Sequence, residues 1–153
     1  EKAQENLRGT AKTAGIDPQR LYFAKWLPYG EYLKGFQLCD LYLDTWHYSA
    51  GSTAISALGA GLPVLTVTHD SNASRMGACI VAAAGLTDLI CDSLESYQSR
   101  AISLLVNPKQ LQFYKAQLRE HPATLPLFDN AQFAKKLEDA FFDIWEQRRD
   151  SAE

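Results

Sequence analysis

Short apolar runs alternate with helical segments along this chain, and this alternation restricts its fold more than any other feature. The runs are predicted as strands, and they are apolar nearly throughout instead of alternating with polar residues. They are Leu21–Ala24, Leu38–Asp44, Pro63–Val67 and Leu89–Cys91. A strand that is apolar on both faces has to be covered on both faces, as in parallel sheets. The pattern therefore predicts an α/β fold, with a Rossmann-like parallel sheet and helices on both faces.

The segments between these runs carry helix signals. The predicted helices are residues 2–14, 29–37, 53–60, 72–84, 94–106, 108–119 and 130–148. Three of them end at a glycine, which readily terminates a helix. We predict Asp92 as the cap of the helix at 94–106, and Pro108 as the first residue of the next one. The last helix carries an apolar stripe of Phe133, Leu137, Phe141, Ile144 and Trp145, and the proline-containing segment His121–Asp129 before it is predicted as a loop.

The composition argues against several classes of function. The 153 residues suffice for one domain, and the net charge of −3 provides no basic surface for nucleic acid or an anionic membrane. No apolar run approaches the roughly 20 residues needed to span a bilayer. Cys39, Cys79 and Cys91 lack disulfide or zinc-ligand spacing, so we predict buried, reduced thiols in a cytoplasmic protein. The chain begins without Met inside a helical segment, and we expect it to be a piece of something longer.

Ligands bind parallel sheets where a strand turns into a helix, which here selects the loops 24–30, 44–53 and 67–73. In the second loop, Gly51 lets backbone amides approach a ligand, while Ser52 and Thr53 place hydroxyls and amides at a helix N-terminus. The positive end of the helix dipole favours a phosphate there. An ordinary helix cap is the alternative interpretation, because Ser and Thr cap many helices.

The other two loops give weaker signals. In the first, Lys25 is placed to meet a phosphate and Trp26 or Tyr29 to meet a base, although packing of the loop explains both aromatic residues equally well. In the third, Arg75 either reaches a ligand or forms a surface ion pair. His47 and His69 have no Ser, Cys or metal-ligand partner at a useful spacing, so neither is predicted to be catalytic.

Several ordered motifs are specific enough to indicate a family. They are Arg20–Pro28, Gln37–Thr45, Ala60–Thr66, Ala73–Arg75 and Pro126–Asp129, the last followed by a helix with Trp145-Glu146. In this order, and without gaps from about residue 20 to 80, they resemble the C-terminal catalytic region of the O-linked N-acetylglucosamine (O-GlcNAc) transferase and SPINDLY-like family.

The resemblance implies a glycosyltransferase with two facing Rossmann-like domains, the GT-B architecture. Residues 1–153 would form a single nucleotide-sugar-binding domain, corresponding to most of the C-terminal half. Such enzymes transfer GlcNAc or a related sugar from a UDP-sugar to Ser or Thr hydroxyls of proteins, without a metal ion or other cofactor. The implied partners are the UDP-sugar, an acceptor protein, and the N-terminal catalytic half and helical repeats of the parent chain.

The resemblance also implies a set of site residues. The diphosphate-binding Gly-His-Thr-Thr segment of the family falls on Ala50–Thr53, so Gly51 replaces its histidine. The ribose-binding aspartate falls on Ser56, a lysine near the nucleotide on Tyr29, and the base-stacking histidine on Tyr32. The predicted nucleotide-sugar site is therefore Gly51, Ser52, Thr53, Ser56, Lys25, Tyr29 and Tyr32.

The departures from the family pattern leave alternatives open. Either the donor is held differently, with Lys25 replacing the lost cation, or donor binding is weak or lost. In the second case the chain is a non-catalytic Rossmann-like module used for protein contacts. A different UDP-sugar enzyme of the same architecture would need a carboxylate at 68–75, where Asp70 is the candidate. We expect no turnover from these 153 residues alone.

Overall fold

The computed structural model describes residues 1–120 and 125–150, and it divides into two compact units. The first is Glu1–Tyr32 and the second is Leu33–Glu153. In the first unit, helix α1 (Lys2–Thr13) is followed by a short 3₁₀ helix, η1 (Pro18–Arg20), and an extended segment. The guanidinium of Arg8 lies over the ring of Phe23, 5.3 Å from its centroid, and so fixes part of that segment on α1.

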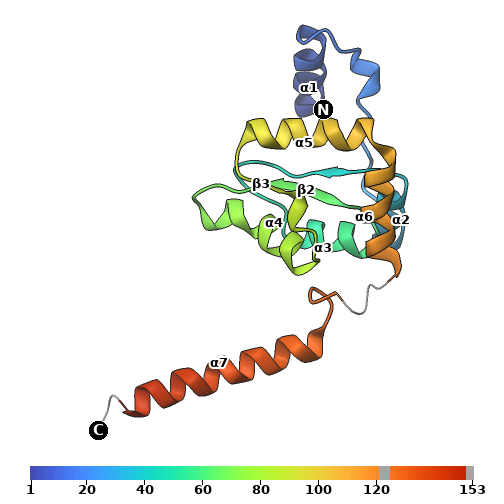
Figure 1. Ribbon diagram of the computed structural model, residues 1–153. Helices are drawn as coiled ribbons and strands as arrows, with labels where there is room; N and C mark the ends of the chain where they lie inside the picture. The colour runs from blue at the N-terminus through green and yellow to red at the C-terminus, as the bar shows by residue number, and fades with distance from the viewer. Residues whose placement is uncertain (121–124, 151–153) are drawn as a thin grey trace. The chain divides into compact units, whose positions relative to one another are not determined.

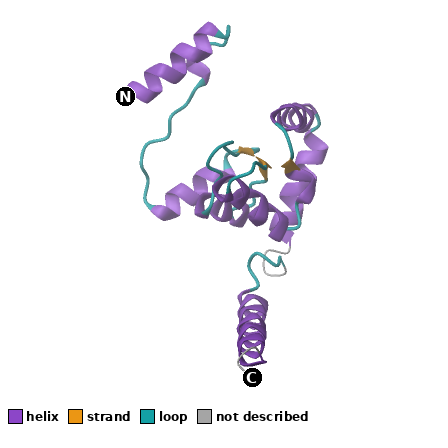
Figure 2. Ribbon diagram, turned by 90° about the vertical axis from the view of Figure 1, so that its left-hand side faces the viewer, coloured by secondary structure: helices purple, strands orange, loops and turns teal. Residues whose placement is uncertain are grey.

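The second unit contains a three-stranded sheet formed by β1 (Tyr42–Leu43), β2 (Val64–Val67) and β3 (Ile90–Cys91). The order is β1-β2-β3, and both pairs of strands are parallel (Figure 1). Helix α5 (Leu94–Val106) lies on one face of the sheet, with α3 (Ser52–Gly59) and α4 (Asn72–Ala83) on the other, and Figure 2 shows the same layering from the side. The predicted parallel sheet with helices on both faces is confirmed.

Every predicted helix is present in the described residues, with ends shifted by at most two positions. Besides α1 they are α2 (Tyr29–Gln37), α3 (Ser52–Gly59), α4 (Asn72–Ala83), α5 (Leu94–Val106), α6 (Pro108–Glu120) and α7 (Asn130–Asp150), and a short 3₁₀ helix, η2 (Thr87–Leu89), precedes β3. Gly61 shows why glycine ends these helices, because its φ of +83° is strained for any residue with a Cβ atom. None of the described helices combines the length and apolarity that a bilayer-spanning segment needs.

Two of the predicted strands are wrong in whole or in part. Leu21–Ala24 is extended but pairs with no described strand, and Tyr22 is 92% exposed. A β-prone sequence becomes a strand only when a neighbour accepts its backbone hydrogen bonds. The strand predicted over 38–44 shortens to Tyr42–Leu43 because its first residues are held differently. The buried amino group of Lys115 binds the backbone oxygen of Cys39 at 2.9 Å and the carboxylate of Asp40 at 2.7 Å.

The cap of α5 is Ser93 and not the predicted Asp92. The amide of Ser96 donates to the Ser93 hydroxyl at 3.2 Å, and the Ser96 side chain returns a bond to the Ser93 amide, which makes a capping box. Asp92 instead accepts hydrogen bonds from the hydroxyls of Ser96 and Ser93. These two bonds hold the pKa of the Asp92 carboxyl below its ordinary value.

The core is centred on β2, and all four residues of this strand are buried because helices cover both faces. The largest fully buried apolar side chains come from the strands, the helices and the turns between them: Leu58, Leu62, Val64, Leu65, Val67, Val81, Leu86, Leu89 and Leu104. Leu125 is also buried, and the ring of Phe128 lies against Gly59. Residues 121–124 of the predicted loop lie outside the described residues.

The predicted apolar stripe of α7 is present on the helix, but all of its side chains are exposed. The thiols also depart from the prediction. Cys91 is buried in the core, whereas Cys39 and Cys79 are exposed. Cys39 lies in the turn after α2, and Cys79 is on the outer side of α4, whose inner side carries Ala78 and Val81.

This difference in burial predicts two reactive thiols and one protected thiol in the folded chain. Burial raises the pKa of Cys91, which further reduces its thiolate fraction at neutral pH. A chromogenic disulfide reagent should therefore modify Cys39 and Cys79 quickly and Cys91 only after denaturant is added. The variant Cys91→Ser should keep both fast reactions, and a fast third reaction in the native wild-type protein would contradict the structure.

Candidate functional site

The loop between β1 and α3 is organised by the carboxylate of Asp44, which is only 5% exposed. Its Oδ1 accepts hydrogen bonds from the amides of Thr45 and Ala50, both at 2.8 Å. Its Oδ2 accepts a bond from the hydroxyl of Thr66 on β2 at 2.7 Å. One side chain thus closes the loop at both ends and attaches it to the central strand.

Ser49 attaches the same loop to α4. Its hydroxyl donates to the backbone oxygen of Ala73 at 2.7 Å and accepts from the amide of Gly77 at 2.8 Å. Its own amide donates to Ala73 as well, at 3.1 Å. The loop is therefore held on one side by β2 and on the other by the first turns of α4.

Gly77 permits this close approach of α4 to the loop. A Cβ atom at this position would lie 2.3 Å from Oδ2 of Asp44 and 3.0 Å from the Thr66 hydroxyl. The first contact is shorter than non-bonded atoms tolerate and the second is tight, so a side chain at Gly77 would force the helix and the loop apart.

The N-terminus of α3 follows directly after this loop. The amides of Ala54 and Ile55 donate to the backbone oxygen of Gly51, at 3.0 and 3.2 Å. The amides of Gly51, Ser52 and Thr53 donate to no other group in the described residues. Within the part of the chain that the structure describes, no side chain caps the helix. Three backbone donors and two hydroxyls are therefore available at the positive end of the helix dipole.

This helix end opens into a pocket of about 410 Å³. Its lining includes Tyr42, Thr45, Tyr48, Ser49, Ala50, Gly51, Ser52, Thr53 and Met76. A Cβ atom on Gly51 would lie 2.9 Å from the sulfur of Met76, so Met76 occupies the space into which a larger residue at 51 would project. Tyr48 and Met76 were not predicted, and Met76 in particular comes from another helix and carries no local signal.

The structure brings Gly51, Ser52 and Thr53 together in this pocket. Ser56 lies on the same helix one turn later and is half-buried, but it is not among the residues that line the pocket. The remaining predicted site residues, Lys25, Tyr29 and Tyr32, belong to the first unit.

Lys25, Tyr29 and Tyr32 line one pocket of about 550 Å³ within the first unit. Ala24, Trp26 and Leu27 complete its lining. The rings of Tyr29 and Tyr32 are 6.3 Å apart and inclined by 31°, and Trp26 is 89% exposed. A cation and three aromatic side chains therefore surround a hollow with mostly apolar walls, as suits a planar base with a charged group beside it.

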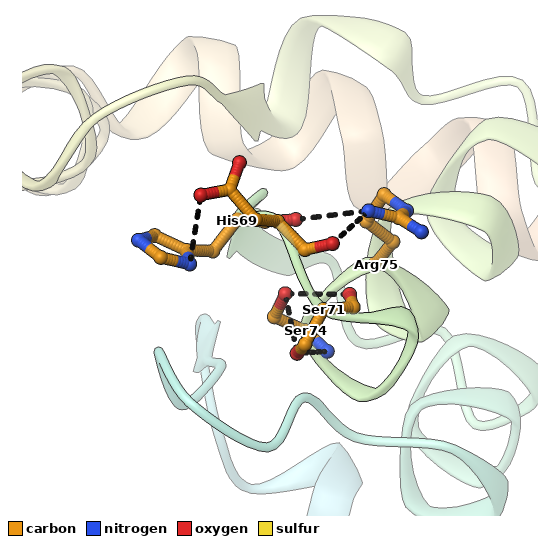
Figure 3. Close-up of polar contacts among 5 residues, drawn as sticks. His69, Ser71, Ser74 and Arg75 are labelled. Atoms are coloured by element: carbon orange, nitrogen blue, oxygen red, sulfur yellow. Dashed lines mark hydrogen bonds and ion pairs between the residues drawn. The ribbon is translucent and has the colours of Figure 1, made fainter.

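The loop at 68–75 is braced by its own residues (Figure 3). The hydroxyl of Ser71 accepts from the amide of Ser74 at 3.1 Å and caps α4. The guanidinium of Arg75 donates to the backbone oxygens of His69 and Asp70, which accounts for this cation without a ligand or a surface ion pair. The Asp70 carboxylate is fully exposed, 4.0 Å from the imidazole of His69.

A larger pocket of about 570 Å³ lies between β3 and α5, among Thr68, Cys91, Asp92, Ser96, Arg100 and other residues. Its charged groups are partly engaged already, because Arg100 donates to the Tyr114 hydroxyl at 2.9 Å and Asp92 accepts two serine hydroxyls. None of the predicted site residues lies there. Within residues 1–120 and 125–150, no cluster of three His, Cys, Asp or Glu side chains could hold a metal ion.

Comparison with known proteins identifies the family. The sequence profile of glycosyl transferase family 41 matches residues 1–137. The chain belongs to glycosyl transferase family 41. The predicted resemblance to O-GlcNAc transferase and SPINDLY proteins is thereby confirmed.

Among curated relatives, this family 41 chain is 32% identical over 139 residues to an Arabidopsis thaliana protein named "Probable UDP-N-acetylglucosamine--peptide N-acetylglucosaminyltransferase SEC". The match covers 90% of the chain and 14% of the relative. A Petunia hybrida SPINDLY protein is 29% identical over 132 residues, covering 86% of the chain and 14% of the relative. The chain thus spans about one seventh of the curated relatives' length.

A solved structure of a mutant Thermobaculum terrenum O-GlcNAc transferase is also similar to this chain. The TM-score is 0.89 at 27% sequence identity, and the match covers 98% of this chain and 29% of that one. The α/β unit described above therefore corresponds to part of an O-GlcNAc transferase structure.

The close contact at Gly77 predicts that Gly77→Ala destabilises the protein by about 1–3 kcal/mol, because helix, loop and strand have to separate to admit a methyl group. Gly35→Ala is the matched control, since a Cβ atom at this helical glycine meets nothing within 4 Å. It should stabilise the protein by about 0.5–1 kcal/mol through helix propensity. Denaturant unfolding measures both, and equal effects of the two variants would contradict the described packing.

The hydroxyl of Tyr97 is expected to make the stability of the folded protein depend on pH. It donates to the backbone oxygen of Asp44 at 2.9 Å, and burial, followed by the charge of Asp44, raises its pKa from 10.0 to about 12. The folded protein thus keeps this proton when the unfolded chain has lost it. The contribution to stability is complete below about pH 10 and is lost as the pH rises towards about 12.

Tyr97→Phe should remove this part of the alkaline loss of stability, as measured by denaturant unfolding between pH 8 and 12. Spectrophotometric titration should show that Tyr97→Phe loses one late-ionising tyrosine relative to the wild type. A late phase of unchanged amplitude in Tyr97→Phe would contradict the assignment.

Proposed function

We propose that this chain is part of the donor-binding half of a protein O-GlcNAc transferase. It would correspond to the C-terminal half of a GT-B glycosyltransferase that binds UDP-GlcNAc or a related UDP-sugar. The sugar would be transferred to Ser or Thr hydroxyls of an acceptor protein. The family membership supports the reaction class, and the open N-terminus of α3 supports the role in donor binding.

The observation that carries the proposal is the arrangement of donors at Gly51–Thr53. The three amides have no partner in the described residues, and the hydroxyls of Ser52 and Thr53 line the same pocket. A diphosphate would accept hydrogen bonds from this cluster, and the helix dipole would favour its negative charge. The same groups would stabilise the additional charge on the diphosphate as the bond to the sugar breaks.

Within the first unit, the residues around Lys25, Tyr29 and Tyr32 are proposed to bind a nucleotide base. Tyr29 or Tyr32 would stack on the base, and Lys25 would supply a positive charge. Lys25 would thus take over a charge that the family pattern places at position 29.

The departures at Gly51 and Ser56 predict weaker donor binding than the family pattern would give. Gly51 contributes only its amide, and the thioether of Met76 lies where a histidine would project. Ser56 would offer the ribose one neutral hydrogen bond instead of a charged one. The amides at the end of the helix would stabilise the negative charge of the leaving diphosphate through hydrogen bonds. On this basis we propose that the sugar is transferred without a metal ion.

Turnover would require more than these residues, since the chain spans about 14% of the curated relatives it matches. The proposed partners are the UDP-sugar, an acceptor protein, and the N-terminal catalytic half and helical repeats of a longer protein. A cytoplasmic location is part of the same proposal. The chain alone is proposed to bind the donor without transferring the sugar.

The second candidate function is a non-catalytic module that contacts proteins through the same fold. It is favoured by the replacement of the family's His, Asp and Lys by Gly51, Ser56 and Tyr29. The two candidates differ in one measurable property, which is whether the chain binds UDP.

The test is calorimetric titration of the chain with UDP, for the wild type and for Ser52→Ala/Thr53→Ala. Each hydroxyl lost to a charged phosphate weakens binding by about 1.5–3 kcal/mol, so the double variant should bind roughly 100-fold more weakly or worse. The matched control is Ser99→Ala/Thr87→Ala, which removes two exposed hydroxyls of the same unit and should leave the affinity unchanged. A wild type that shows no heat at millimolar UDP would leave only the protein-contact module.

A further inference from the structure

The carboxylate of Asp44 is buried without an oppositely charged partner among the described residues. A charge in this position is costly unless hydrogen bonds replace the lost water. Asp44 has three such bonds, from two backbone amides and one hydroxyl. If the site required only packing, an apolar residue of similar volume would avoid the cost of burying the charge. The role of the charged side chain is therefore to be found in the groups that its hydrogen bonds hold in place.

The two carboxylate oxygens of Asp44 accept hydrogen bonds from different parts of the second unit. Oδ1 receives both amide bonds, from the first and the last residue of the six-residue loop Thr45–Ala50. Oδ2 receives the Thr66 hydroxyl and connects the loop to β2. The amide that Oδ1 fixes at Ala50 directly precedes the unpartnered amides of Gly51, Ser52 and Thr53. The orientation of these donors therefore depends on Oδ1 of Asp44 together with the bonds that hold Ser49 on α4.

Resting on the proposed function, we infer that Asp44 is a positioning residue for the donor diphosphate. Its Oδ1 holds the loop so that the amides of Gly51–Thr53 face the pocket before the ligand arrives. Preformed donors bind an anion more tightly than donors that have to be ordered on binding. Asp44 itself does not touch the diphosphate, since two like charges would repel each other.

The inference predicts that UDP binding needs the acceptor oxygen Oδ1 of Asp44 and not the negative charge of its carboxylate. Asp44→Asn keeps an oxygen in the Oδ1 position and turns its NH₂ group towards Thr66, whose hydroxyl can accept a hydrogen bond. This variant should bind UDP within about threefold of the wild type. Asp44→Ala removes the acceptor and should weaken UDP binding at least tenfold.

Thr66→Val is the matched control for a merely structural role. It removes the bond to Oδ2 and leaves both amide bonds to Oδ1 in place. It should lower the melting temperature and leave the affinity for UDP unchanged.

The experiment measures the dissociation constants of UDP and of uridine for the wild type, Asp44→Asn, Asp44→Ala and Thr66→Val. The ratio of the uridine constant to the UDP constant isolates the diphosphate contribution. This ratio should fall at least tenfold in Asp44→Ala alone, whereas a loss of stability would affect both ligands. An unchanged ratio in Asp44→Ala, or an equal fall in Thr66→Val, would overturn the inference.

Amide hydrogen exchange of the unliganded wild type gives a second measurement that does not depend on the folding of a variant. The Ala50 amide should be protected without UDP, and Gly51–Thr53 should become protected when UDP is added. Fast exchange at Ala50 in the free protein would overturn the inference while the proposed function stands. A wild type that binds no UDP would instead overturn the proposed function, and the positioning role with it.

Discussion

The buried carboxylate of Asp44 joins three parts of the second unit that are distant in sequence. It closes the loop after β1, receives the hydroxyl of Thr66 on β2, and leaves so little space beside it that α4 needs a glycine at position 77. The backbone oxygen of the same residue accepts from Tyr97 on α5. Helices α4 and α5 lie on opposite faces of the sheet (Figure 1), so Asp44 lies close against α4 at Gly77 in one layer and bonds to Tyr97 of α5 in the other. The open end of α3 follows from this anchoring, because the loop that Asp44 and Ser49 fix leads directly into it.

The resemblance to the family predicts a histidine of the family pattern at position 51, where this chain has a glycine. A histidine cannot fit at position 51 while Met76 holds its present place, since even a Cβ atom would meet the sulfur at 2.9 Å. Gly51 and Met76 therefore form a matched pair, in which a thioether on α4 fills the space beside the helix end. The backbone donors at Gly51–Thr53 remain without a partner among the described residues. The proposed donor binding accordingly depends more on backbone amides and hydroxyls than on charged side chains.

Much of the fold could be predicted from local patterns. The helices at 72–84 and 94–106 were predicted to within one residue, because their apolar spacing and terminating residues are local properties. The strand predicted at Leu21–Ala24 is not formed, because an apolar run becomes a strand only when a neighbouring strand pairs with it. The exposure of Cys39 and Cys79 was missed for a related reason. A small, moderately apolar residue gives little indication of which side of its element faces the core.

The sequence by itself determined the alternation of strands and helices, the glycines that end three of the helices, the loop that carries Gly51–Thr53, and the family. All of these depend on residues close together in the chain or on their order. Only the tertiary structure decided that the end of α3 is uncapped and open, that Met76 stands beside it, and that Ser56 lies outside its pocket. Only the structure gave Asp44 its three donors, because the loop has to fold back to bring the Ala50 amide to it and Thr66 reaches it from the neighbouring strand β2. Hydrogen bonds of this kind depend on angles and distances between elements, which no spacing of residues along the chain can encode.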